Sequence, residues 1–191
     1  FGDISSSLEV LQTDLLSKYN FKQVGVAGHP EGSPEISNEE LDKAIIEKNK
    51  FSKNADFKIY LATQFFFEAY SLIEWEKHLK KIGNQLEIHA GIPGPASLKT
   101  LIAYAKSCGI GNSLRFLSKQ AFNIAKLAST KTPDKLIYDL ASYKNSCNQS
   151  NLQKLHFYAF GGIKKTSYWL NSLKKYDFIY NSKNEFEILS D

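Results

Sequence analysis

The chain of 191 residues is 42% hydrophobic and 23% charged, with a formal net charge of +4 at pH 7. These values are typical of one globular domain, no apolar run approaches the ~20 residues of a membrane helix, and no signal segment opens the sequence. Arg115 is the only arginine, and the other positive charges are dispersed lysines. Proteins that recognise bases or phosphates rely on arginine, so this charge does not indicate nucleic-acid binding. We therefore expect one cytoplasmic domain over residues 1–191 that binds neither membranes nor nucleic acid.

Helices and strands are predicted to alternate along the chain. Leucines at helical spacing indicate a first helix over residues 5–20, with serines available to cap it. There follow, in order, a strand at 23–28, a helix at 37–51, a strand at 57–67, a helix at 68–84, a strand at 85–92, helices at 95–109, 112–129 and 132–146, a strand at 152–160, a helix at 161–176 and a hairpin at 178–188.

This alternation predicts an α/β fold built from parallel βα units with right-handed crossovers. A helical insert at about residues 111–149 is the only break in the rhythm. The strand at 57–67 is almost continuously apolar, which is typical of a strand buried on both faces. Ser37 or Asn38 is expected to cap the helix before it, with glutamates in its first turn.

Polar and special residues gather where the four predicted strands end. Because the carboxyl ends of parallel strands meet at one face of a β/α barrel, this gathering predicts a ligand site there. The alternative is that glycine and proline end these strands for purely conformational reasons. The four segments are His29-Pro30-Glu31, Thr63-Gln64, Gly91-Ile92-Pro93-Gly94-Pro95 and Gly161-Gly162.

Metal and nucleophile chemistry find no support in the sequence. Cys108 and Cys147 form no CxxC or metal-spacing pair, and free, buried or half-buried thiols are expected. No set of His, Cys and Asp has metal-ligand spacing, and no GxSxG nucleophile elbow is present.

Four segments in register resemble the methylenetetrahydrofolate reductase family. AGHPEGSPE resembles that family's AGYPEGHPE loop, LATQFFFE its ITQFFF strand, HAGIPGP its PGI segment and LHFYAF its last barrel strand. The resemblance covers roughly residues 20–170 and is closest to a divergent branch. It implies an eight-stranded (β/α)8 barrel of TIM type that holds FAD and passes hydride from NAD(P)H to 5,10-methylenetetrahydrofolate. The four strands here would be the fifth to the eighth, the C-terminal half of the barrel.

The resemblance assigns four residues to the flavin. His29 and Ser33 fall at loop positions that border the FAD, and the prolines around them would stiffen this loop before binding. Asp42 and Lys48 fall at helix positions that contact the cofactor in the family, with a lysine in place of the family's arginine.

Three residues are assigned to the folate in the same way. Gln64 matches the glutamine that binds the pterin, for which a carboxamide offers both a donor and an acceptor; the alternative is a glutamine that bonds local backbone. Tyr104 falls at an aromatic position that stacks on the substrate, although helical spacing also suits core packing. Thr100 stands where the family has a glutamine.

The sequence departs from the family at the last strand. Gly162 replaces an arginine, with Lys164 and Lys165 nearby, and a glycine pair before a helix is also a generic phosphate-binding arrangement. His89 and His156 lie in strands and are expected to be satisfied structural histidines. No residue of the chain is identified as the catalytic acid or base.

The first four barrel strands have no counterpart in the chain, so we expect a fragment of the enzyme. A half-barrel exposes two apolar strand edges, which predicts self-association or pairing with a chain that supplies the other half; the terminal hairpin is a candidate cover. The first alternative function is a non-catalytic folate- or nucleotide-binding half-barrel or assembly subunit. The second is an unrelated phosphate-ligand barrel enzyme built on FGGIKK.

Overall fold

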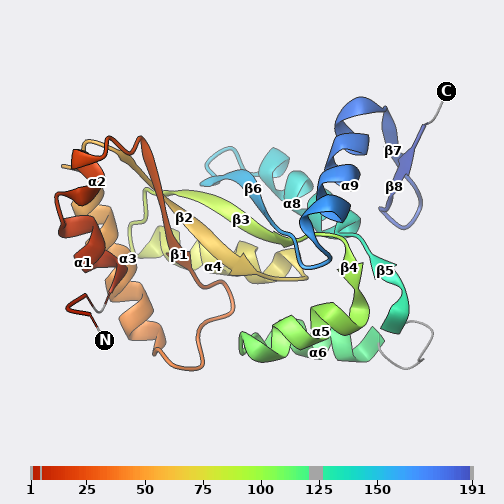
Figure 1. Cartoon of the computed structure of the whole chain (residues 1–191), viewed down its shortest axis with the longest axis horizontal. Coiled ribbons are helices and arrows are strands. Elements are labelled where there is room, and N and C mark those ends of the chain that lie inside the picture. The colour runs from red at the N-terminus through yellow and green to blue at the C-terminus, as the bar shows by residue number, and fades with distance from the viewer. Residues whose placement is uncertain (1, 5, 121–126, 190–191) are drawn as a thin grey trace.

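A parallel sheet of four strands forms the centre of the molecule (Figure 1). The structure is a computed structural model that describes residues 2–4, 6–120 and 127–189. The sheet has the order β1-β2-β3-β6, and each neighbouring pair is parallel, as predicted. Within the described residues the sheet is open and does not close into a barrel. Its strands are β1 (Gln23–Gly28), β2 (Lys58–Phe65), β3 (Glu87–Pro93) and β6 (Leu152–Tyr158).

Helices connect these strands, and two small antiparallel sheets complete the fold. The helices are α1 (Ser7–Gln12), α2 (Leu15–Lys18), α3 (Asn38–Ser52), α4 (Ala69–Lys81), α5 (Leu98–Ser107), α6 (Gly111–Gln120), α8 (Asp134–Ser146) and α9 (Ile163–Lys175). The small sheets pair β4 (Ala96–Ser97) with β5 (Thr130–Lys131) and β7 (Phe178–Tyr180) with β8 (Phe186–Ile188). Of the helix predicted at 112–129, residues 121–126 lie outside the described part of the chain.

The predicted cap of α3 is confirmed, whereas the single N-terminal helix is wrong. Ser37 Oγ accepts a hydrogen bond from Glu40 N, and the Glu40 carboxylate accepts one from Ser37 N. These two bonds form a capping box. At the N-terminus, Thr13 is extended and both its N–H and its Oγ donate to Val10 O. This local bonding ends α1 and separates it from α2.

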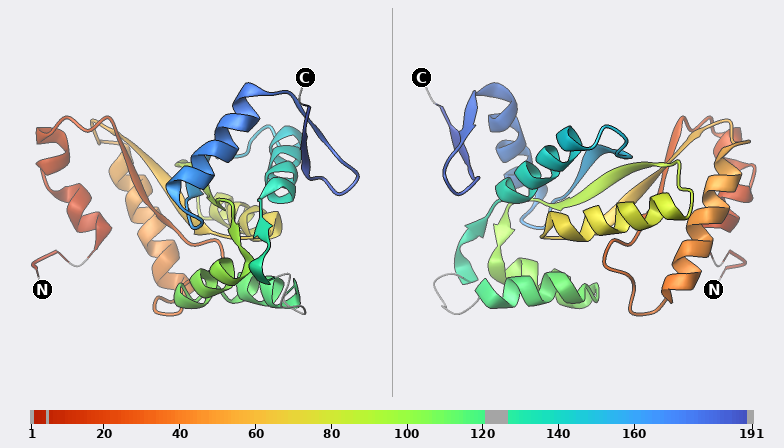
Figure 2. Two further views of the ribbon diagram at one scale, coloured as in Figure 1. Left: turned by 45° about the vertical axis from the view of Figure 1, so that its right-hand side comes forward. Right: turned by 180° about the vertical axis from the view of Figure 1, so that it is seen from behind.

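One face of the sheet carries the main apolar core. Figure 2 shows α4 and α8 along the same side of the sheet, and buried residues of α3, α4 and α8 pack there against alternate strand residues such as Leu61 and Ile88. Along β2 burial alternates, and Tyr60, Ala62 and Gln64 are only half-buried. The expectation that this strand is buried on both faces is therefore wrong, because helices cover only one of them.

A buried carboxyl group joins α4 to the segment before β6. Glu76 is 1% exposed and accepts from Ser150 Oγ at 3.0 Å and from Asn151 N. Tyr143 of α8 also bonds to Glu76, and burial is the larger reason why the pKa of this phenol is raised. The start of β6 is thus fixed by a group far away in the sequence.

The two edges of the sheet, β1 and β6, each have one neighbouring strand within the described residues. The C-terminal hairpin does not cover either edge by pairing with it, because β7 and β8 bond only to each other. It packs on α8 and α9 instead. Phe186 N donates to Asp134 Oδ2 at 3.2 Å, and the Phe186 ring stacks on Trp169 with centroids 6.2 Å apart.

Neither a membrane span nor a metal cluster is found in the described part of the chain. No helix there is long and apolar enough to cross a membrane. No group of three or more His, Cys, Asp or Glu side chains is placed to hold a metal ion. Cys108 and Cys147 are half-buried free thiols, as expected, and Lys80 Nζ lies 3.7 Å from Cys147 Sγ.

Candidate functional site

The helices α5 and α6 form a separate layer next to the carboxyl ends of the strands, below the sheet in Figure 1. Phe65 at the end of β2 joins a second apolar cluster with Leu98, Leu101 and Ile110 of these helices and their connection. The helices thus cover the strand ends where the sequence predicts a ligand site.

The loop after β1 begins with a tight turn. Gly32 N donates to His29 O at 3.1 Å, with Pro30 at the second position of the turn and Gly32 at the fourth. Proline presets the backbone angle needed at that second position, and Gly32 has a positive φ of 77°, which glycine adopts without strain. The segment AGHPEG therefore forms a turn that reverses the chain immediately after β1.

Glu31, at the tip of this turn, ties the loop to two helices. Its carboxylate accepts from Ser113 N at 3.0 Å, from Ser113 Oγ at 2.7 Å and from Ser71 Oγ at 3.1 Å. By contrast Glu35, from the second Pro-Glu pair, is exposed, and its N–H donates to Ser33 Oγ at 3.2 Å. This difference between the two glutamates is not predictable from their local sequence.

The connection between α5 and α6 contacts both the loop after β1 and the end of β2. We call residues 108–113 the α5–α6 turn. Pro34 packs so closely on Gly109 that a Cβ added there would lie 2.6 Å from Pro34 Cγ. From β2, Gln64 Nε2 donates to Cys108 O at 3.3 Å. Loop, strand and turn are thereby in contact with one another.

The folate candidates lie on or against α5. Thr100, Tyr104 and Cys108 follow at intervals of four along the helix and its cap, and Gln64 bonds to the last of them. Tyr104 is 43% exposed and stacks on Phe160, with ring centroids 4.3 Å apart. Thr100 is engaged locally, because its Oγ lies 2.8 Å from Ser97 Oγ at the helix cap.

The flavin candidates are arranged differently. His29 and Asp42 line a cavity of about 530 Å³ between the β1 loop, α3 and α4, whose lining is rich in carboxylates. Asp42 Oδ2 lies 2.7 Å from His78 Nε2. Ser33 is not part of this cavity lining and accepts from its own loop. The structure therefore brings His29 and Asp42 to one cavity and leaves Ser33 outside it.

Lys48 is an unusual residue of this set, because its side chain is only 6% exposed. No ion pair to it is found among the described residues. Burial lowers the pKa of this amine, and burial together with the Lys48 charge lowers the pKa of His29. A buried cation without an ion-pair partner is stabilised by an anionic group, which restores the charge balance.

The two strand histidines do not behave alike. His89 is 7% exposed and stacks on Tyr60 with centroids 3.8 Å apart, yet its Nε2 has no hydrogen-bond partner. The expectation of a satisfied structural histidine is wrong for this atom. His156 is exposed and meets Tyr158 edge to face.

The glycine pair after β6 has a conformational explanation. A Cβ at Gly161 would collide with Pro95 O, and Gly162 has a φ of 97° at the start of α9. The structure therefore requires both glycines for the turn itself.

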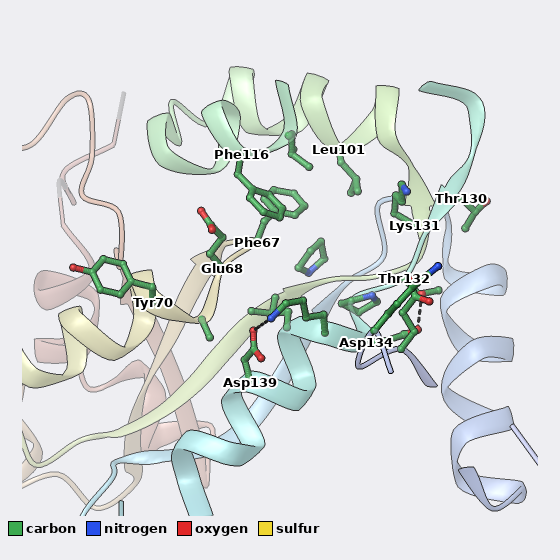
Figure 3. Close-up of a pocket in the computed structure, with 18 residues that line it drawn as sticks. Phe67, Glu68, Tyr70, Leu101, Phe116, Thr130, Lys131, Thr132, Asp134 and Asp139 are labelled. Carbon is green, nitrogen blue, oxygen red and sulfur yellow. Dashed lines mark hydrogen bonds and ion pairs between the residues drawn. The ribbon is translucent and has the colours of Figure 1, made fainter. Parts of the chain in front are cut away.

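A second cavity, of about 490 Å³, opens between α5–α6 and the start of α8 (Figure 3). Phe67, Phe116 and Leu101 form apolar walls, and Asp134 bonds to Thr132 at one end. None of the seven residues assigned by resemblance lines it.

Comparison with known proteins agrees with the motif reading. The family model described as methylenetetrahydrofolate reductase matches residues 11–161. Methylenetetrahydrofolate reductase 2 of Saccharomyces cerevisiae is 30% identical over 121 residues, which are 62% of this chain. The match spans 18% of the yeast protein, so the chain corresponds to a small part of that relative's length. On the extent of the family match, this chain belongs to the methylenetetrahydrofolate reductase family.

Proposed function

We propose that the chain contributes the folate-binding half of a flavin-dependent reductase, in which hydride passes from NAD(P)H through FAD to 5,10-methylenetetrahydrofolate. The observation that carries this proposal is the contact of Gln64 with the cap of α5, one turn beyond Tyr104. Gln64, assigned to the pterin edge, therefore contacts the end of the same helix that carries Tyr104, assigned to the pterin face.

Gln64 and Tyr104 have the functional groups that this role requires. One N–H of Gln64 is used on Cys108 O, which leaves its carbonyl oxygen and a second N–H for a ligand. Tyr104 stacks on Phe160 through one ring face and is still 43% exposed. A pterin could stack on the ring while its edge bonds to the carboxamide.

The residues near β1 fit FAD only in part. Lys48 and His29 suit the anionic diphosphate of the cofactor, because the buried ammonium lacks a carboxylate partner among the described residues. The cavity beside them suits it poorly, since Glu31, Glu39 and Asp42 line it. Of these residues, Lys48 and His29 would hold the diphosphate despite the neighbouring carboxylates, and FAD would supply the hydride relay.

The chain's own contribution to the chemistry is placement. Gln64 would orient the pterin, Tyr104 would fix its plane, and α5 with α6 would exclude water from above the strand ends. No side chain near Gln64 is an evident proton donor among the described residues, so the proposed reaction would need an acid from outside them.

We further propose that the working protein is an assembly, either a homo-oligomer or a pair with a chain that completes the barrel. The parallel edges β1 and β6 each have a free side among the described residues, and the sheet face that carries Tyr60 and Gln64 is only half-buried. Free parallel edges and an uncovered face favour pairing with another sheet.

The experiment is a pair of titrations on the purified chain, one with FAD and one with 5-methyltetrahydrofolate, the expected reaction product. Gln64→Ala should weaken folate binding roughly tenfold or more and leave FAD binding unchanged. Gln85→Ala, an exposed glutamine that precedes β3 at the opposite end of the sheet, is the matched control. Equal folate affinity in Gln64→Ala and Gln85→Ala would contradict the proposal.

A non-catalytic folate-binding subunit is the second candidate, and the absence of an evident proton donor near Gln64 favours it. Saturable binding of FAD and folate without oxidation of NADH or NADPH, even with a companion chain present, would support this second function.

A further inference from the structure

We propose that Glu31 is a positioning residue which, through Ser113 and the α5–α6 turn, fixes the orientation of the Gln64 carboxamide. The inference rests on the proposed function in that Gln64 is taken to bind the folate. It assigns a distinct role to the first Pro-Glu pair of AGHPEGSPE.

The first step is that Glu31 caps α6 from outside the helix. Ser113 is the third residue of α6, and its N–H donates to Glu31 Oε2 at 3.0 Å while its Oγ donates to Oε1 at 2.7 Å. Ile110, which precedes the helix, has no side-chain oxygen to cap it. A carboxylate from 82 residues earlier therefore does what an N-cap residue usually does.

The second step is that this contact holds the α5–α6 turn against the β1 loop. Ser71 Oγ of α4 donates to the same carboxylate at 3.1 Å, so Glu31 is fixed from two helices. On the other side of the turn, Pro34 packs on Gly109. The turn is thus held at both its ends by one loop.

The third step links the turn to Gln64. Cys108 O, at the beginning of the turn, can only accept, so the carboxamide must direct its nitrogen there. The Gln64 oxygen is then left for the proposed ligand. If the turn shifts, the amide loses the contact that distinguishes its two ends, and it can rotate to present nitrogen instead.

The consequence is a preference for ligands that present an N–H donor to Gln64. A pterin ring carries such donors along its amide edge. Glu31→Gln keeps the size of the side chain but weakens its bonds to Ser113, because charge-assisted hydrogen bonds are the stronger ones. It should loosen the turn and randomise the Gln64 amide without touching the folate itself.

The test compares the unsubstituted chain with Glu31→Gln, and with Glu35→Gln as the matched control from the second Pro-Glu pair. Hydrogen exchange of the backbone over residues 108–115 should become faster in Glu31→Gln and stay unchanged in Glu35→Gln. Binding of 5-methyltetrahydrofolate should weaken by roughly fivefold to twentyfold in Glu31→Gln alone.

A double-mutant cycle separates positioning from general damage. If Glu31 acts through Gln64, the losses in Glu31→Gln and Gln64→Ala are not additive, and the double variant binds folate about as weakly as Gln64→Ala. Additive losses would overturn the proposal, as would exchange rates equal to those of Glu35→Gln. If the unsubstituted chain binds no folate, the proposed function fails, and the exchange data alone then decide whether Glu31 holds the turn.

Discussion

The two faces of β2 differ in how deeply their side chains are buried. Ile59, Leu61 and Phe65 point to apolar neighbours and are almost completely buried. Tyr60 and Gln64, on the alternate positions, are half-buried and polar. Side chains of a strand alternate between faces, so the run KIYLATQFFF contributes both to a helix-covered core and to a half-buried surface.

The comparison teaches that burial identifies the residues whose loss unfolds the chain, whereas half-burial with an unused polar group identifies candidates for function. The predictions below compare substitutions on the two faces, from the largest expected effect to the smallest.

Leu61→Ala should have the largest effect. Leu61 is completely buried in the core against the helices, and removal of such a side chain costs about 2–5 kcal/mol of unfolding free energy. Urea unfolding followed by circular dichroism measures the loss. Tyr60→Phe, one residue away on the other face, should change stability by less than about 0.5 kcal/mol. Equal losses in the two variants would contradict the division of the strand.

The uncovered edges predict association in solution. The chain should form concentration-dependent oligomers in sizing with light scattering, because β1 and β6 each lack a second neighbour among the described residues. Leu155→Lys places a charge on an exposed position of β6 and should shift the population toward monomer. A monodisperse monomer at every concentration would exclude this proposal.

Acidification should destabilise the fold. The pKa of His29 and that of His89 are both lowered in the folded chain, in each case mainly by burial. The unfolded chain therefore binds more protons below the ordinary histidine pKa of about 6.5, and the stabilisation is complete above this pH and lost as pH falls below it. Thermal unfolding at pH 7.5 and pH 5.5 should show a loss on the order of 1 kcal/mol. A midpoint that rises on acidification would contradict the assignment.

His89→Phe should have only a small effect at neutral pH. The substitution keeps a ring beside Tyr60 and removes a buried nitrogen that has no hydrogen bond and lies 3.8 Å from Glu87 Oε2, so stability at pH 7.5 should change by less than about 1 kcal/mol. The loss between pH 7.5 and pH 5.5 should become smaller than in the unsubstituted chain. An unchanged pH dependence would mean that His89 does not contribute to it.

Local signals in the sequence were sufficient to predict most of the sheet, whereas the position of the site stays a prediction. The strand at 23–28 and the cap at Ser37 were predicted from short-range sequence patterns, and both occur at those residues in the structure. The break at Thr13 was missed because leucine spacing continues across it, although the backbone does not. The short strands β4 and β5 have too few residues to produce a pattern.

Within the candidate site, candidate residues could be named from the sequence, but their contacts and burial could not be predicted from it. Gln64 and Tyr104 could be named from motifs, and their common contact with α5 was not visible in the sequence. Glu31 and Glu35 stand in nearly identical local contexts, and only the distant Ser113 distinguishes them. The burial of Lys48 could not be anticipated either, because lysine on an amphipathic helix is normally solvated.

The buried Glu76 has a consequence for the order of folding. Its carboxyl group is desolvated on α4, but its partners Ser150 and Asn151 arrive about 75 residues later in the chain. Docking of α4 before that segment would leave a buried polar group without bonds, which is costly. The final consolidation of α4 and the addition of β6 should therefore occur as one late, cooperative step, and this long-range closure should set the refolding rate of the whole sheet.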